Sequence, residues 1–200
     1  MDNITVLKEE SDMKKELDEM TLEELWELFP IILAEHHDQW IKWYQEEQDH
    51  LYSLLSKVDL VRIAHVGSTA INGIWAKPTI DILIETKNKK EFEVVYQVLL
   101  DGGYSCMYKN ERIGFNKGYT KDGFAERVFH IHVRNYGDHD ELYFRDYMNE
   151  KSLLAKEYED LKLELWKQYE HDRDGYTEAK TDFIKTYTEQ AKKEYAGRYE

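Results

Sequence analysis

Residues 60–85 constrain the fold of this chain more tightly than any other segment. They contain a short β-branched run at 60–66, a small-residue turn at 67–69 and a second apolar run at 78–85. Asp81 interrupts the second run. An ionised carboxylate inside an apolar strand is unfavourable unless it is paired, hydrogen-bonded or bound to a metal ion. We therefore expect two strands joined by a turn, with a polar site around Asp81.

The turn between these strands has the features of a phosphate site. Gly67 lets a ligand approach the backbone closely, and Ser68 and Thr69 offer hydroxyl and amide groups of the kind that bind phosphate. Lys77 directly precedes the second strand and is expected to reach the same phosphate. The alternatives are structural, namely a lysine solvated in its loop and, for Asp81, a carboxylate that caps a loop or pairs with a lysine.

Two histidines are expected to complete the site. His130 and His132 are two residues apart in an apolar run, so both side chains leave the same face of the predicted strand. Together with Asp81 they form a candidate divalent-metal site, in which imidazoles suit zinc or manganese better than magnesium. The alternative is a histidine pair on the solvent face of the sheet.

The remaining pattern predicts an α/β domain with a mixed β-sheet flanked by helices. Thr21 and Glu24 form a capping box ahead of a short amphipathic helix that ends near Pro30. Residues 113–119 and 126–134 flank an Asp-Gly turn and predict a hairpin. Helical spacing of apolar residues predicts further helices at 37–57, 89–100, 144–167 and 177–195.

The charge is distributed unevenly. The formal net charge is −14, and residues 1–29, with ten acidic and three basic residues, contribute half of it. We therefore expect residues 1–30 to form an acidic extension, whose helix packs on the domain or binds a partner protein, and residues 31–200 to form the domain. Such an acidic surface disfavours broad nucleic-acid binding. A locally basic cleft can still hold a nucleotide or another small phosphorylated molecule.

The composition also indicates a cellular location. Cys106 is the single cysteine, which excludes an internal disulfide and suits a reducing compartment. No stretch approaches the roughly 20 apolar residues of a membrane span, and the first residues lack the pattern of a secretory signal. We expect a cytoplasmic protein that does not enter a membrane.

Two basic residues in the last third of the chain are further candidates for the phosphate site. Arg145 opens a predicted helix, and its guanidinium group can bind a phosphate with two donors. Its alternative is an ion pair with Asp81 or Asp146. Lys180 lies four residues after Tyr176 and shares a helix face with it, so it is expected to line the cleft or to lie on the helix surface.

These motifs resemble known proteins. The Gly-Ser turn followed by Asp81 resembles the signature of the nucleotidyltransferase superfamily, in which the turn holds a triphosphate and strand carboxylates hold a divalent metal. The motifs HVGSTAINGIWAKPTIDILIE, RVFHIHV, ELYFRDYMNE and GYTEAKTDFI, in this order, resemble the GrpB family of bacterial proteins over about residues 36–192. That family belongs to the superfamily by fold, so the resemblance implies a nucleotidyltransferase-like sheet and catalytic roles for Ser68 and Asp81.

The chain departs from the superfamily pattern at the second metal-binding acid. That position, two residues after Asp81, is Leu83, and Glu85 lies about 13 Å from Asp81 at a rise of about 3.3 Å per residue. A complete two-metal site is therefore not expected. Three hypotheses remain: metal-assisted nucleotidyl transfer or phosphoester hydrolysis, non-catalytic binding of a nucleotide or coenzyme for regulation, and protein interaction through the acidic extension.

Overall fold

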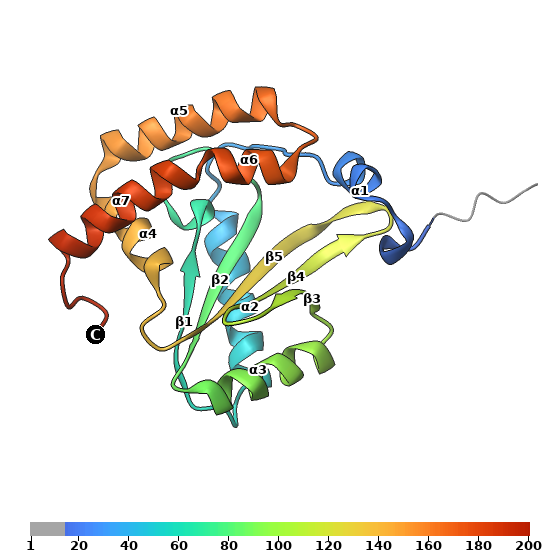
Figure 1. Cartoon of the computed structure of the whole chain (residues 1–200), viewed down its shortest axis with the longest axis vertical. Helices are drawn as coiled ribbons and strands as arrows, with labels where there is room; N and C mark the ends of the chain where they lie inside the picture. Colours follow the sequence, from blue (N-terminus) through green and yellow to red (C-terminus); the bar gives the residue numbers. More distant parts are fainter. Residues whose placement is uncertain (1–14) are drawn as a thin grey trace, which may run out of the picture.

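The structure, a computed structural model, describes residues 15–200 and contains one five-stranded β-sheet with helices around it (Figure 1). The strands are β1 (Leu60–Val66), β2 (Thr79–Thr86), β3 (Ser105–Lys109), β4 (Ile113–Thr120) and β5 (Gly123–Asn135). The α-helices are α1 (Leu22–Leu28), α2 (Gln39–Leu54), α3 (Lys89–Asp101), α4 (Asp140–Glu150), α5 (Ser152–Gln168), α6 (Arg173–Ala179) and α7 (Thr181–Glu194). Two short 3-10 helices are η1 (Leu17–Glu19) and η2 (Ser68–Ala70).

The sheet is mixed, which confirms the predicted fold class. Its strand order is β1-β2-β5-β4-β3, and β2 and β5 run parallel while the other neighbours are antiparallel. The parallel pair sets Asp81 opposite His130 and Leu83 opposite His132. Residues that are about fifty positions apart in the chain therefore become direct neighbours in the sheet.

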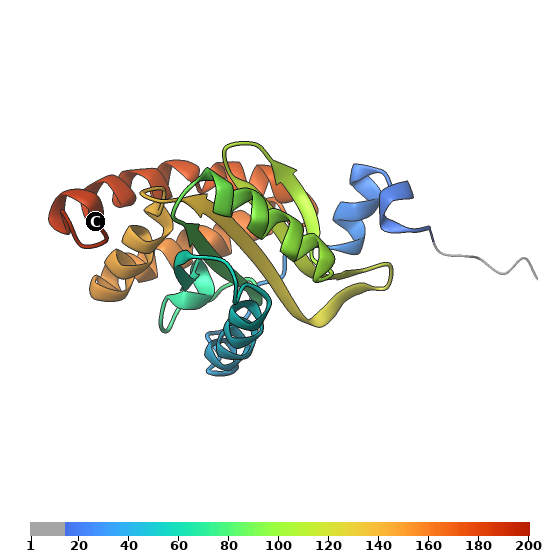
Figure 2. The same cartoon turned by 90° about the horizontal axis from the view of Figure 1, so that it is seen from below.

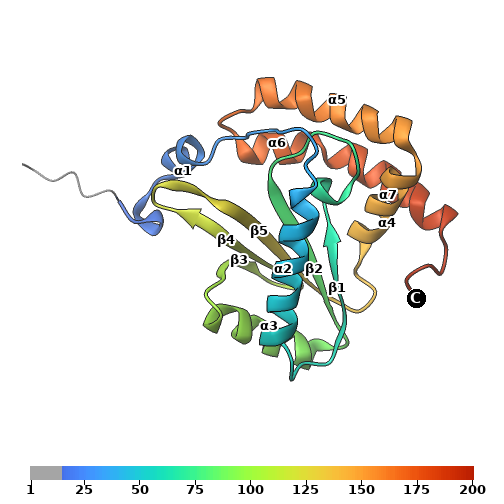
Figure 3. The same ribbon diagram turned by 180° about the vertical axis from the view of Figure 1, so that it is seen from behind.

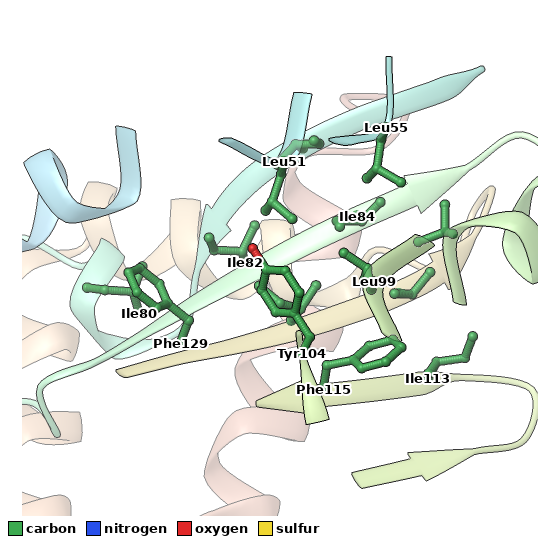
Figure 4. Close-up of a cluster of buried hydrophobic side chains, with 14 of the residues drawn as sticks. Leu51, Leu55, Ile80, Ile82, Ile84, Leu99, Tyr104, Ile113, Phe115 and Phe129 are labelled. Carbon is green, nitrogen blue, oxygen red and sulfur yellow. The ribbon is translucent and has the colours of Figure 1, made fainter. Parts of the chain in front are cut away.

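One face of the sheet forms the main hydrophobic core. Ile80, Ile82 and Ile84 alternate with the polar-face residues of β2, so they all point to the same side. They are fully buried against side chains of α2 and α3, including Leu51 and Leu99 (Figure 4). Full burial of each such side chain contributes about 1.5–3 kcal/mol, so this face sets the register of β2 and thereby the position of Asp81.

The other face of the sheet meets the C-terminal helices. Seen from below, the strands lie between α2 on one side and α7 on the other (Figure 2). From behind, α2 crosses the sheet while α5, α6 and α7 gather along its upper side (Figure 3). Aromatic residues of α4, α5 and α7, such as Phe144, Tyr158 and Tyr195, form a second buried cluster. The polar face of β2 and β5 is therefore overhung by helices instead of lying open to solvent.

Three parts of the fold differ from the prediction. β3 is missing from it, because all five residues of this edge strand are exposed and show no apolar alternation; pairing with β4 defines the strand more than its own pattern does. The prediction of one helix over 144–167 is wrong, since the chain breaks at Lys151 between α4 and α5. The helix predicted over 177–195 is likewise divided, at Lys180 between α6 and α7. The sequence predicts neither break, because its apolar spacing continues across both.

The predicted N-terminal helix is present and begins at its capping box. Thr21 accepts a hydrogen bond from the backbone of Glu24, whose side chain accepts one from the Thr21 backbone. Just after the helix, Phe29 is buried and packs on Tyr119 and Phe124 of the β4–β5 hairpin, with ring centroids 4.8 Å and 5.1 Å away. The predictions for residues 1–14 lie outside the described residues. Each helix of the described part is too short or too polar to cross a membrane.

Candidate functional site

The turn after β1 brings the backbone against the side chain of Asp81. Gly67 has φ 70° and ψ −170°, a conformation that is essentially restricted to glycine. A Cβ atom at Gly67 would lie 2.3 Å from Oδ2 of Asp81 and 2.8 Å from its Cβ. The glycine is therefore required both by the backbone and by contact with Asp81, and Ser68 begins η2 at the same point.

The polar face of the sheet brings Asp81, His130 and His132 together. His132 Nε2 lies 2.9 Å from Asp81 Oδ1, and His130 Nδ1 lies 3.5 Å from the same oxygen. All three side chains are about one quarter exposed. The histidines do not lie on an open solvent face, because they border a cleft under the C-terminal helices.

The hydrogen bonds around the histidines determine which ring nitrogens carry a proton. Arg173 donates to the Tyr119 hydroxyl at 2.8 Å. That hydroxyl lies 2.7 Å from His130 Nε2 and keeps its own proton available for this nitrogen; with the hydroxyl as donor, the ring proton lies on Nδ1, which is 3.5 Å from Asp81 Oδ1. Burial lowers the pKa of His130 and thereby favours the neutral ring; the nearby Asp81 opposes this shift without reversing it.

His132 is oriented in the same way by Arg134. One guanidinium nitrogen of Arg134 lies 3.4 Å from His132 Nδ1. A guanidinium group only donates hydrogen bonds, so Nδ1 accepts and the ring proton lies on Nε2, directed at Asp81. Each imidazole thus points an N–H group at the carboxylate, and each unprotonated nitrogen is occupied by another donor.

This arrangement does not fit the predicted metal site. A histidine binds a metal through its unprotonated nitrogen, and in both rings that nitrogen faces away from Asp81. Among residues 15–200, no group of three or more His, Cys, Asp or Glu side chains is placed to hold a metal ion. Glu85 does not supply a ligand either, because it is fully buried in an ion pair with Arg62 and a contact with His139.

The two imidazoles instead stabilise the carboxylate form of Asp81. Burial raises the pKa of Asp81, but the hydrogen bonds from His130 and His132 outweigh burial and hold the pKa below its usual range. Asp81 is therefore a charged acceptor at neutral pH, paired within the protein.

Four partly or fully buried basic side chains line the same cleft as this trio, namely Lys77, Lys162, Lys180 and Arg173. Within residues 15–200, none of the four forms an ion pair with a carboxylate; the carboxylate on the floor of the cleft pairs with the histidines. Lys77 and Lys180 lie over the ring of Tyr176, at 5.8 Å and 4.5 Å from its centroid. The cleft as a whole is lined by six basic and five acidic side chains, so it is far less acidic than the protein, whose net charge is −14.

Burial, and to a lesser extent the neighbouring positive charges, make the charged forms of the three lysines less favourable. Burial lowers the pKa of Lys77 to about 7, and the nearby positive charges of Lys180 and Arg173 add to this shift. Burial likewise lowers the pKa of Lys162 to about 7 and that of Lys180 to about 8. A bound anion would restore ordinary pKa values, because it favours the protonated amines.

The cleft has a volume of about 820 Å³, within the size range of small-molecule sites. Of the residues predicted for the phosphate site, four line it, namely Gly67, Ser68, Lys77 and Lys180. The structure brings these four together with the predicted metal trio.

Two predicted phosphate ligands lie elsewhere. Arg145 forms an ion pair with Asp146 at 2.7 Å and donates to the backbone carbonyl of His65. The structure therefore shows the alternative to phosphate binding, an ion pair with Asp146. The Thr69 hydroxyl is buried, where it contacts His65 Nε2 at 3.0 Å and donates to the carbonyl of Thr79. Neither residue lines the cleft. Each instead makes hydrogen bonds to residues that flank the turn, and so stabilises the backbone on either side of it.

Lys162 and Arg173 are absent from the sequence-based site. Lys162 is 1% exposed and donates to the carbonyl of Trp75. Its signal in the sequence is the helical spacing of Tyr158, Lys162 and Leu165, which puts a lysine on the buried stripe of α5. Arg173 gives no such signal, because it opens the short helix α6 and reaches the cleft only through the packing of that helix.

Comparisons with known proteins agree with this architecture. A family model described as "GrpB protein" matches residues 30–190. The glutamate-rich protein GrpB of Alkalihalophilus pseudofirmus is 33% identical over 166 residues, which cover 77% of this chain and 91% of that protein. The UPF0157 protein YqkA of Bacillus subtilis is 30% identical over 166 residues, with 82% of this chain and 48% of YqkA covered. The chain thus spans about half the length of YqkA.

A solved structure shows the same arrangement. The crystal structure of the protein GrpB from Enterococcus faecalis matches with a TM-score of 0.70 at 26% identity. The match covers 82% of this chain and 99% of that one. Together with the family match, it confirms the resemblance that the four sequence motifs predict.

Proposed function

Because this chain belongs to the GrpB family and four cations without a carboxylate partner among residues 15–200 line the cleft that holds its Gly-Ser turn, we propose that it binds a nucleotide or another phosphorylated small molecule through its phosphates. The observation that carries the proposal is the cluster of Lys77, Lys162, Lys180 and Arg173 in one cleft. Lys162 is buried and the other three are half-buried, and cations withdrawn from solvent without a carboxylate partner are unfavourable by themselves. A polyanion in the cleft removes that penalty.

The proposed binding mode uses both the backbone and the side chains. The amides that begin η2 at Ser68 offer donors to one phosphate. Lys77, at the entry to β2, and Lys180, between α6 and α7, neutralise its charge. Charge-assisted hydrogen bonds of this kind are about twice as strong as neutral ones, which suits a ligand with several phosphate groups.

Binding is better supported than nucleotidyl transfer. The position of the second metal-binding acid is occupied by Leu83, which is fully buried with Val66 and Leu142. Asp81 accepts two imidazole N–H groups, so its role in this proposal is to orient the histidines. The divalent ion, the catalytic roles of Ser68 and Asp81 and transferase activity stay predictions, and no step of the proposal depends on them.

The test is a binding measurement on the whole chain. Isothermal titration calorimetry with ATP and with inorganic tripolyphosphate, each in EDTA and in Mg²⁺, should show saturable one-site binding in both buffers. Lys77→Met should weaken binding of both ligands about tenfold. Lys167→Met provides the matched control, because it removes the same charge from an exposed position on α5 and should change nothing.

The outcomes separate the hypotheses. Absence of binding for ATP and tripolyphosphate in both buffers would overturn the proposal. Binding that requires Mg²⁺ would overturn direct phosphate recognition and support the predicted metal site. Release of phosphate or pyrophosphate from ATP, lost in Asp81→Ala, would show catalysis beyond binding.

A further inference from the structure

We propose that Tyr108 and Met107 form a subsite for a planar ring, at the end of the cleft opposite the lysines. The inference rests on the proposed phosphate site and extends it, because it assigns the rest of the ligand. Both residues are strongly exposed, with 43% and 61% of their surface accessible, although they lie beside a polar cleft. Exposed apolar side chains at the mouth of a cleft are typical of ligand contacts.

A break in the strand pairing directs both side chains to the cleft. The register between β3 and β4 shifts between Cys106 and Tyr108, which is the mark of a β-bulge. Successive residues of a regular strand point to opposite faces, whereas a bulge can re-aim a side chain. Met107 contacts the side chain of Asn116, which is opposite His130 and so on the cleft face. Both residues of the bulge line the cleft.

The ring of Tyr108 is held in place by a glycine. Gly114 pairs with Tyr108 on one side and with His132 on the other, so its missing side chain would also lie on the cleft face. A Cβ atom at Gly114 would lie 2.3 Å from a ring carbon of Tyr108. The tyrosine ring therefore lies directly on the backbone of β4, and its exposed surface forms the wall of the cleft beyond His132.

The geometry of the cleft gives the ligand two chemically distinct ends. The Tyr108 ring lies over β4, which is two strand spacings of about 4.8 Å from β2, so roughly 10 Å separate the Tyr108 platform from the strand of Asp81. The basic end suits a polyphosphate, and the tyrosine and methionine end suits a flat, polarizable ring. A nucleotide has both parts joined by a sugar, whereas inorganic polyphosphate has only one.

The experiment compares a ligand that has the ring with one that lacks it. Titration of the full chain should give tighter binding of ATP than of inorganic tripolyphosphate. Tyr108→Ala should weaken ATP about tenfold, which corresponds to about 1.4 kcal/mol, and leave tripolyphosphate unchanged. Tyr108→Phe should retain ATP binding, because the aromatic face is preserved. Tyr52→Ala, at a tyrosine of similar exposure on α2, should change neither affinity.

The subsite and the phosphate site fail in different ways. Equal affinities of the wild-type protein for ATP and tripolyphosphate, or no effect of Tyr108→Ala on ATP, would overturn the ring subsite and leave the phosphate site standing. A parallel loss of both ligands in Tyr108→Ala, while Tyr108→Phe binds normally, would also overturn it. A wild-type protein that binds neither ligand would overturn both proposals.

Discussion

A Cβ atom added to Gly67 would lie 2.3 Å from Oδ2 of Asp81, so the backbone of the turn after β1 is in direct contact with the carboxylate of β2. Their contact fixes where the backbone donors of the turn lie relative to the carboxylate and its two imidazoles. The phosphate end of the cleft therefore depends on the absence of one side chain as much as on the presence of charged ones.

Gly67→Ala should destabilise the protein and weaken phosphate binding. A positive φ alone costs an ordinary residue about 1–2 kcal/mol, and the overlap with Asp81 adds to this. Gly73→Ala is the control, because Gly73 has φ 69° but nothing within 4 Å of its Cβ position. Chemical denaturation should show the larger loss of unfolding free energy for Gly67→Ala. Equal losses for the two variants would contradict the importance of the contact with Asp81.

Asp81→Asn should bind tripolyphosphate in EDTA at least as tightly as the wild-type protein. The amide oxygen still accepts the N–H group of His132, while one negative charge is removed from an anion site. Calorimetric titration measures the affinity, and near-ultraviolet circular dichroism checks that the fold is retained. A metal-binding role for Asp81 predicts the opposite result, namely a loss of binding in Mg²⁺.

Lys162→Met should weaken tripolyphosphate binding by about tenfold or more with little change in stability. Methionine keeps most of the volume of this buried side chain. It removes an ammonium group that has no carboxylate partner among the described residues, which stabilises the fold, but it also removes the donor to the Trp75 carbonyl, which offsets that gain. The thermal midpoint should stay close to that of the wild-type protein while affinity falls. A variant that unfolds at lower temperature but binds normally would assign Lys162 a structural role only.

Phosphate affinity should fall as pH rises from about 6 to about 9. Lys77 and Lys162 have pKa values lowered to about 7, and that of Lys180 is lowered to about 8, so the free cleft loses its positive charge over this interval. A bound anion favours the protonated amines, so binding near pH 8 should take up protons. Titrations in buffers with different ionisation enthalpies measure this uptake. An affinity that does not change across the interval would show that these lysines do not contact the ligand.

Much of the fold could be predicted because local patterns determine it. Alternation of apolar and polar residues in 129–133 predicts one strand face for His130 and His132, and the capping box at Thr21 predicts the start of α1. Such signals depend on near neighbours in the chain. β3 and the break at Lys151 lack a local signal, because the pairing of one strand and the packing of two helices produce them.

The sequence by itself determined the strand–turn–strand unit, the glycine at Gly67, the isolated aspartate and the same-face histidines, because each follows from the conformation of a few adjacent residues. Only the tertiary structure decided what these groups do together. Arg134 and Tyr119 orient the imidazole N–H groups toward Asp81. Helices from the far end of the chain bring Lys162 and Arg173 to the cleft, and Asp146 holds Arg145 away from it. Protonation and charge depend on neighbours in space, and those neighbours are remote in sequence.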